Sequence, residues 1–365
     1  MFPRRLSRIT SRRKRFHTAV TATLVLLVFG CRGRPLAQRT SQLGEPQAVD
    51  GVTAIVDAFE RYPIVALGDL HGCQEFYDFI DRLVRRPELA DHVNDIIVEF
   101  GNARFQDVVD RYTSGGEVSV AELGKVWRDH TNPIVFDSPV YEQFFKRIRE
   151  VNRDRPPAKR FRVHLGDPPI DWSQTTTNRD WGRMLYQRDR HFASVVQAAS
   201  FARGRRALLI IGGAHLVRGS DNNVTSQIEA QHPGTMFIVI PHDGFRERHD
   251  ELEPALTKWK VGSLALLRGT WFGALHPRYR WLQMKDVKLT TPDGRVVEAR
   301  LENMVDAWLY VGPRDLLTEA MPFPGIYRDE YWNELQRRHM IMWGTPLSPS
   351  SGDINTSARY FVKPR

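Results

Sequence analysis

Cysteine is scarce in this sequence, because Cys31 and Cys73 are the two cysteines among 365 residues. A cysteine-rich zinc site needs several such ligands, and a small disulfide-stapled domain needs several pairs. Both classes are therefore excluded. A chain of this length can instead bury a large apolar core, since the share of surface removed on folding grows with size.

Several sequence motifs of well-known enzyme classes are also missing. No glycine-rich dinucleotide or P-loop motif follows the first predicted strand, so a nucleotide cofactor is not expected. The Gly-x-Ser-x-Gly motif, in which α/β hydrolases present a serine nucleophile, is absent as well. Cys73 could act as a nucleophile, but a small buried residue at a helix start explains it better.

Acidic residues are absent from the first 40 positions, which carry ten of the 52 lysines and arginines. The remainder has 42 basic against 43 acidic residues, so the formal net charge of +9 resides in this leader. Nucleic-acid binding usually requires a basic patch on the folded domain. Because the body is nearly neutral, we expect no nucleic-acid partner.

The leader has the organisation of an export signal. Its basic stretch is followed by the apolar run 19–29 and then by Gly30 and Cys31. Such a short run cannot comfortably span a bilayer but suits the core of a signal peptide. The stretch Val28–Cys31 is similar to a lipoprotein processing site. We expect residues 1–31 to be a signal peptide or N-terminal anchor, and the protein to be exported, either periplasmic or held at the membrane by the anchor or by a lipid on Cys31.

Behind the leader, residues 32–50 have the composition of a linker, and apolar runs then alternate with amphipathic patterns. Short apolar runs without polar alternation are typical of strands buried on both faces. Strand–helix alternation is typical of a mainly parallel, doubly wound sheet flanked by helices, so the predicted fold class is α/β. The predicted strands are 64–67, 95–100, 161–165, 207–211 and 236–240, and the clearest predicted helices are 75–85, 139–151 and 188–202.

The pattern changes after residue 243. Residues 244–365 are rich in Trp, Pro and Gly, and Thr291–Gly294 has the composition of a hairpin turn. We therefore expect an α/β domain over residues 51–243 and a C-terminal α+β extension over residues 244–365 that covers the sheet or lines a cleft.

Polar residues follow each predicted strand at its carboxyl end. In parallel sheets these ends lie along one edge, which is where open α/β folds bind ligands. A carboxylate inside an apolar run, such as Glu99, is costly to bury unless it is paired or bound to a metal. We expect one site assembled from the residues that end the successive strands, which are Asp69 and His71, Glu99, Asp167, His215, and His242.

Two histidines and a carboxylate permit two kinds of chemistry. In the first, His71, Glu99 and His215 are ligands of a divalent metal that lowers the pKa of a bound water. In the second, one histidine oriented by Asp69 or Glu99 is a general base, and Arg188 stabilises an oxyanion. The sequence leaves both possibilities open.

These motifs, in this order, resemble the erythromycin esterase/ChaN/Tiki/TraB superfamily. Gly68–Gly72 is similar to the opening Gly-x-x-His of the family, with Glu99 in the following strand. Arg188-Asp189 is similar to the Arg-Asp that begins a late helix in the esterases, and Gly212–Leu216 to the second Gly-x-x-His of the Tiki/TraB branch. The resemblance covers residues 60–243.

The resemblance implies a hydrolase that cleaves an ester or amide bond in a small-molecule or peptide substrate. Asp69 is one methylene shorter than the Glu of the esterase branch. The superfamily also contains haem-binding lipoproteins, so the alternative implied is a haem- or metal-binding lipoprotein without turnover. For the hydrolase, the expected catalytic residues are His71, Glu99, His215, Asp69 and Arg188, and the expected substrate-binding residues are Asp167, Asp189 and His242.

Two further interpretations stay open. Gly68–Cys73 is also similar to the opening motif of calcineurin-like metallophosphoesterases, which hold two metals and require more ligand motifs later in the chain. Here Gly212–His215 lacks the Asn of one such motif, and Pro241–Asp243 is not Gly-His-x-His. The last interpretation is an inactive site with a C-terminal region that serves a partner. Oligomeric state is not predicted.

Overall fold

The computed structural model describes residues 43–242, 249–276, 288–290, 295–318, 320 and 329–347. All of them belong to one compact unit that begins at Leu43. The predicted signal peptide with Cys31 and the predicted turn Thr291–Gly294 lie outside the described residues. Within the described residues, no helix combines the length and apolar character needed to cross a bilayer.

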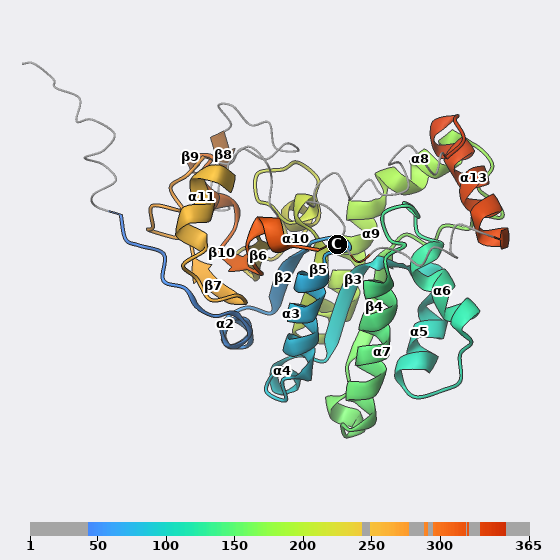
Figure 1. The fold of residues 1–365 in the computed structure, drawn as a ribbon, viewed down its shortest axis with the longest axis horizontal. Coiled ribbons are helices and arrows are strands. Elements are labelled where there is room, and N and C mark those ends of the chain that lie inside the picture. Colours follow the sequence, from blue (N-terminus) through green and yellow to red (C-terminus); the bar gives the residue numbers. More distant parts are fainter. Residues whose placement is uncertain are drawn as a thin grey trace, which may run out of the picture. The chain divides into compact units, whose positions relative to one another are not determined.

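An eight-stranded sheet in the order β1-β7-β10-β6-β2-β5-β3-β4 organises the fold (Figure 1). The pairings from β10 through β6, β2, β5 and β3 to β4 are all parallel, and β7 pairs antiparallel with β10 and with β1. The prediction of a mainly parallel α/β sheet is therefore confirmed. The strands are β1 (Val49–Asp50), β2 (Ile64–Asp69), β3 (Asp95–Asn102), β4 (Arg162–Asp167), β5 (Ala207–Gly212), β6 (Met236–Pro241), β7 (Ser263–Leu266) and β10 (Ala307–Tyr310).

The five predicted strands are all present, and each continues one or two residues into the polar sequence at its carboxyl end. In β2, for example, Gly68 and Asp69 remain in register with Ile211 and Gly212 of β5. The ladder hydrogen bonds therefore hold these polar residues in a fixed backbone geometry. As a result, the strand pairing sets the backbone positions of these polar residues at the edge of the sheet.

Helices cover both faces of the sheet. Alternate residues of β2 enter different cores: Val65 and Leu67 pack under α2, α3 and α7, whereas Ile64 and Ala66 pack under α9 and α10. This explains why the strands are continuously apolar. The helices are α2 (Gly51–Ala58), α3 (Gln74–Arg85), α4 (Leu89–His92), α5 (Gln106–Thr113), α6 (Val120–Arg128), α7 (Pro139–Arg153), α8 (Asn178–Tyr186), α9 (Arg188–Ala199), α10 (Val224–Glu229), α11 (His249–Leu256), α12 (Leu301–Met304) and α13 (Asp329–Trp343).

The region beyond residue 243 contributes to the main sheet itself, through β7 and β10. It also contains a separate antiparallel pair, β8 (Lys288–Thr290) with β9 (Val296–Glu298), on either side of the predicted turn. The expected extension is therefore partly a continuation of the α/β sheet, because β10 adds in parallel to β6.

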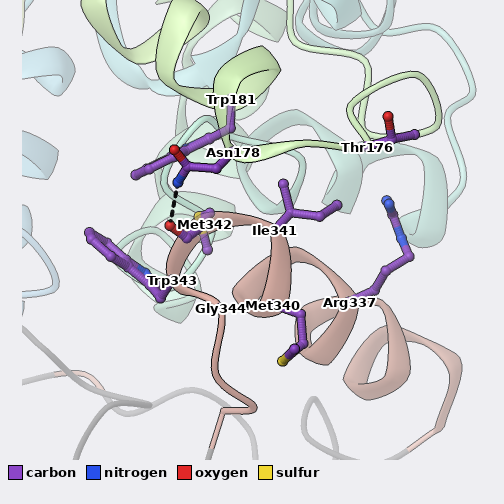
Figure 2. A pocket seen from close by; sticks show the side chains of 9 residues that line it. All are labelled: Thr176, Asn178, Trp181, Arg337, Met340, Ile341, Met342, Trp343 and Gly344. Carbon is purple, nitrogen blue, oxygen red and sulfur yellow. Dashed lines mark hydrogen bonds between the residues drawn. The ribbon is translucent and has the colours of Figure 1, made fainter.

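A small third core joins α8 to α13. The rings of Trp181 and Trp343 lie 5.2 Å apart, and the Asn178 side chain donates a hydrogen bond to the Met342 carbonyl (Figure 2). These contacts anchor α13 beside the loop that follows β4. They also leave Trp343 partly exposed on the surface.

A leucine pair tests this arrangement. Leu209 in β5 is fully buried, whereas Leu316 is 56% exposed. We expect Leu209→Ala to lower the free energy of unfolding by about 2–5 kcal/mol, because it removes buried methyl groups and leaves a cavity. Leu316→Ala should change it by less than about 0.5 kcal/mol. Urea unfolding of both variants measures the difference, and equal effects would contradict the predicted burial.

Candidate active site

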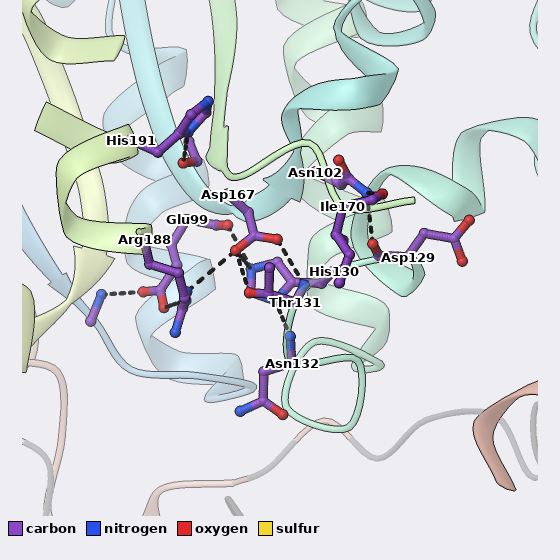
Figure 3. A network of polar contacts seen from close by, with 12 residues as sticks. Glu99, Asn102, Asp129, His130, Thr131, Asn132, Asp167, Ile170, Arg188 and His191 are labelled. Carbon is purple, nitrogen blue, oxygen red and sulfur yellow. Dashed lines mark hydrogen bonds and ion pairs between the residues drawn. The ribbon is translucent and has the colours of Figure 1, made fainter. Parts of the chain in front are cut away.

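The polar residues at the carboxyl ends of β2, β3, β4 and β5 meet at one edge of the sheet. Figure 3 shows the part of this edge where Glu99 of β3 and Asp167 of β4 lie beside Arg188. Asp69 is the last residue of β2, and Glu99 lies inside β3. Asp167 ends β4, and His215 lies in the single 3₁₀ turn that follows β5. The spatial convergence that the sequence predicted for His71, Glu99 and His215 is therefore present.

Asp69 and His71 form the first of two carboxylate–imidazole pairs. The Nδ1 atom of His71 lies 2.9 Å from Asp69 Oδ2, and the Tyr77 hydroxyl donates to Asp69 Oδ1 at 3.0 Å. Asp69 is buried, while the His71 side chain keeps 28% of its surface exposed. Because Nδ1–H faces the carboxylate, the Nε2 atom of His71 is left for chemistry.

Asp189 and His215 form the second pair. The Nδ1 atom of His215 lies 2.7 Å from Asp189 Oδ1, which also accepts the Val224 backbone N–H at 3.1 Å. The Phe192 ring packs edge-to-face on His215 with centroids 5.4 Å apart. His215 thus has its Nδ1 atom held by a carboxylate, as His71 does, on a different element of the fold.

The buried carboxylate of Glu99 lies between the two pairs. Its Oε2 atom lies 4.0 Å from His71 Nε2, and its Oε1 atom lies 3.6 Å from His215 Nε2. Oε1 also accepts a hydrogen bond from Arg188 at 2.5 Å, and Oε2 accepts the Gly212 backbone N–H at 2.5 Å. The Glu99 carboxylate therefore lies between two Asp–His pairs, and Arg188 neutralises its charge.

A glycine at position 212 favours this arrangement. A Cβ atom at this position would lie 3.2 Å from both Glu99 Oε2 and His71 Nε2. Any side chain would therefore crowd the imidazole and the carboxylate. The glycine that follows β5 lets the backbone approach the carboxylate and donate to it.

A second layer of polar residues fixes Arg188 (Figure 3). Arg188 Nε lies 3.3 Å from Asp167 Oδ1, and Asp167 accepts the hydroxyl and the backbone N–H of Thr131 at 2.6 and 2.7 Å. His130 Nδ1 accepts the Asn132 backbone N–H at 2.8 Å, so Nε2 carries its proton and donates to the Glu99 carbonyl at 3.0 Å. Burial lowers the pKa of His130 well below its ordinary value, so this imidazole is neutral.

Charge pairing controls the titration of the central groups. Burial opposes ionisation of Glu99, but Arg188 and the two imidazoles lower its pKa well below the ordinary value. Burial also lowers the pKa of His71, but the carboxylates of Asp69 and Glu99 outweigh it, and the net shift is upward. For His215, Glu99 and Asp189 overcome burial and raise the pKa to about 9. His215 is therefore an imidazolium at neutral pH.

Burial dominates at the two supporting aspartates. It raises the pKa of Asp167 to about 7, against the opposing effects of Arg188 and Thr131. It likewise raises the pKa of Asp69, against the effect of His71. Burial also raises the pKa of the Cys73 thiol well above its usual range, so a cysteine nucleophile is not supported.

The residues do not fit the predicted metal site. Among the described residues, no group of three or more His, Cys, Asp or Glu side chains is arranged to hold a metal ion. A physical reason is that Glu99 Oε1 already accepts a hydrogen bond from the Arg188 guanidinium, whose positive charge opposes a cation beside it. The three residues meet, but as an ion-pair network rather than as a coordination shell.

Haem fits these residues no better. An axial ligand needs an imidazole nitrogen that is open to the iron of a planar ring. The Nε2 atoms of His71 and His215 instead face the Glu99 carboxylate, at 4.0 and 3.6 Å.

The structure corrects two expected substrate-binding residues and reassigns a third. Asp167 is fully buried beneath Arg188, so it positions the guanidinium rather than contacting a substrate. His242 is fully buried and lies 2.9 Å from Glu253, near the rings of Trp308 and Tyr310 rather than in the cluster around Glu99. Asp189 supports His215.

Arg188 also differs from its expected role as an oxyanion stabiliser. Two of its nitrogens face the carboxylates of Glu99 and Asp167, and the side chain is only 11% exposed. Its positive charge is therefore paired with the two buried carboxylates of the protein. The remaining donor of positive charge at the site is the imidazolium of His215.

Sequence reasoning missed His130, Thr131 and Tyr77. The first two follow α6 rather than a strand, so the rule that strand ends converge could not find them. Tyr77 lies on α3, where the apolar face of the helix gives no reason to expect a buried hydroxyl partner for Asp69. The usable signal was the polar run His130–Asn132 after a helix with a strong apolar face.

Comparisons with known proteins give likeness in fold alone. No family model and no curated protein sequence matches the chain. Similar solved structures include a mutant of the erythromycin esterase EreC in its open conformation, with 13% identity, 71% of this chain and 91% of that chain covered, and a TM-score of 0.43. A Bacillus cereus protein has 13% identity, coverages of 75% and 96%, and a TM-score of 0.43. A succinoglycan biosynthesis protein has 9% identity, coverages of 74% and 94%, and a TM-score of 0.48.

The Asp189–His215 pair gives a direct test of the site electrostatics. We expect the His215 imidazole to titrate near pH 9. Asp189→Asn should lower this pKa toward the ordinary value of about 6.5, because the neutral amide no longer stabilises the imidazolium. NMR titration of the imidazole resonances measures both values.

Folding stability should follow the same shift. Because the folded pKa of His215 lies above the unfolded value, this stabilisation is present in full below about pH 6.5 and is lost as the pH rises through about 9. The wild-type advantage over Asp189→Asn should therefore shrink across that window. Asp180→Asn, which changes an aspartate that caps α8, is the matched control. A His215 pKa that is unchanged in Asp189→Asn would contradict the assignment.

Proposed function

We propose that this protein is a hydrolase of an ester or amide bond that uses paired histidines and no metal ion. The observation that carries the proposal is that two Asp–His pairs, on different elements, direct their Nε2 atoms at one buried carboxylate. Structural ion pairs do not require two tautomer-fixed imidazoles with partly exposed faces. Acid–base catalysis uses histidines that are oriented in this way and remain accessible.

His71 is the general base in this proposal. Its Nδ1–H is held by Asp69, so the Nε2 lone pair can accept a proton from water, as in other carboxylate-oriented histidines. A water that donates to both His71 Nε2 and Glu99 Oε2, which are 4.0 Å apart, would be placed for this proton transfer. The resulting hydroxide adds to the substrate carbonyl carbon, and the proton stays on His71.

His215 is the general acid. Its raised pKa keeps the imidazolium protonated at neutral pH, so Nε2–H can stabilise the developing oxyanion and then protonate the leaving oxygen or nitrogen. The products are a carboxylic acid and an alcohol or amine. Glu99 keeps both imidazoles oriented, and Arg188 keeps Glu99 ionised.

The cellular location belongs to the same proposal. The basic and apolar leader supports an exported protein that acts outside the cytoplasm on a small-molecule or peptide substrate. The motif resemblance to erythromycin esterases supports ester hydrolysis in particular. The alternative of haem binding has less support, because both Nε2 atoms face Glu99.

Substitution of the base tests the mechanism. On a panel of ester substrates, we expect His71→Gln to lower kcat by about 10²–10⁴-fold, since general base catalysis contributes that much. His232→Gln should retain full activity, because His232 contacts Gln197 and stacks on Phe201, apart from the Glu99 cluster. An active His71→Gln enzyme would contradict the assignment. A Soret shift with haemin that depends on His71 would favour the binding alternative.

The pH dependence of kcat tests the division of roles. We expect kcat to follow a bell-shaped pH profile. Its acid limb reports loss of the His71 proton, with a pKa above the ordinary histidine value. Its alkaline limb lies near pH 9, where His215 loses its proton. Asp189→Asn should move the alkaline limb to lower pH and leave the acid limb in place. A shift of the acid limb instead would reverse the two roles.

A further inference from the structure

A second polar cleft lies at the opposite edge of the sheet, where β3, β4 and β5 begin. A cavity of about 600 Å³ opens there, and its lining includes Asn94, Asp95, Arg162, Arg205 and Arg206. In the sheet register, Asp95 of β3 lies between Arg162 of β4 and Ala207 of β5. The parallel pairing therefore brings arginines from two other segments of the chain to the side chain of Asp95.

Asp95 is buried and its carboxylate is fully engaged. Arg162 donates to it through Nε and Nη2 at 2.8 and 2.9 Å, and His164 Nε2 lies 2.8 Å from Oδ1. Burial opposes ionisation, but these partners lower the pKa of Asp95 to about 2. The base of the cleft is therefore a fixed ion pair that neither needs nor readily accepts another cation.

The remaining polar groups of the cleft are donors without a close hydrogen-bond acceptor among the described residues, although Arg205 forms a long ion pair with Asp95. Arg205 Nη1 lies 3.8 Å from Asp95 Oδ2, beyond hydrogen-bond distance. Arg206 is exposed and has no acidic partner among the described residues, and the buried Nδ2 atom of Asn94 has no acceptor there. Gly204, with φ at +59°, makes the left-handed turn that leads Arg205 and Arg206 into the cleft.

We propose that this cleft binds a phosphate group. The guanidinium groups of Arg162, Arg205 and Arg206 line the cleft together with one carboxylate, that of Asp95, so the cleft carries excess positive charge. Planar guanidinium groups match the oxygens of phosphate with paired hydrogen bonds, and a phosphate offers enough acceptors for both arginines and the Asn94 amide. The group can belong to free inorganic phosphate or to the headgroup of an anionic phospholipid.

This site is independent of the proposed hydrolase. The cleft uses the amino ends of the strands, whereas His71, Glu99 and His215 lie at the carboxyl ends. Loss of phosphate binding therefore leaves the hydrolase proposal intact, and the reverse also holds.

Isothermal titration of the intact protein with inorganic phosphate tests the proposal. We expect one site, with a Kd that rises at least about tenfold in Arg205→Gln/Arg206→Gln, since each charge-assisted hydrogen bond contributes about that factor. The control Arg179→Gln/Arg183→Gln removes the same charge from exposed positions of α8 and should bind as the wild type does. His71→Gln should also bind normally, because it alters the other edge of the sheet.

Vesicles distinguish the two sources of phosphate. If the ligand is a headgroup, the protein cosediments with phosphatidylglycerol vesicles but not with phosphatidylcholine vesicles, and Arg205→Gln/Arg206→Gln abolishes the cosedimentation. If the ligand is free phosphate, the protein binds inorganic phosphate tightly and does not cosediment with either kind of vesicle. Three results would overturn the proposal: binding that is unaffected in Arg205→Gln/Arg206→Gln, equal losses in both double variants, or no binding of either probe. The single variant Arg206→Gln repeats the test with a smaller change at an exposed position.

Discussion

The buried carboxylate of Glu99 is the constraint on which the rest of the site depends. A lone ionised carboxylate in a protein interior carries a large desolvation cost, which only close positive charge and hydrogen-bond donors can offset. Here Arg188, the Gly212 N–H and two imidazoles surround it. Removing one partner would leave the charge partly uncompensated, so these groups are linked energetically even though they lie far apart in the sequence.

The sequence predicts this meeting because parallel strands have a common direction. Apolar runs identify β2, β3 and β5, and their carboxyl ends then converge whatever the loops do. The role of each polar residue in the site cannot be predicted from the strand direction in the same way. Asp69 and Asp167 both follow a strand and a glycine, yet one supports a partly exposed histidine and the other is buried under Arg188. That difference depends on α9 and on the segment after α6. The convergence of parallel strand ends does not predict the position of either.

The limits of sequence reasoning are similar for the fold. β7 and β10 each contain four residues, too few for periodicity to separate a strand from any other apolar segment. Their place in the sheet depends on non-local pairing, since β10 pairs with β6 and β7 pairs with β10 and with β1. A change in composition after residue 243 therefore indicated a new region, although the sheet continues through it. Local patterns predict elements, whereas non-local pairing decides which sheet they join.

The two edges of the sheet use buried aspartates in opposite ways, and charge balance explains why. At the carboxyl ends, the carboxylates of Glu99 and Asp189 face the positive charges of Arg188 and the His215 imidazolium, so the site has no large excess of either sign. At the amino ends, Asp95 is already satisfied by Arg162 and His164, so the charges of Arg205 and Arg206 are surplus. A balanced network with partly exposed imidazoles suits proton transfer, whereas surplus fixed charge suits the binding of an anion. The same parallel topology therefore supports both proposals, through residues that do not compete.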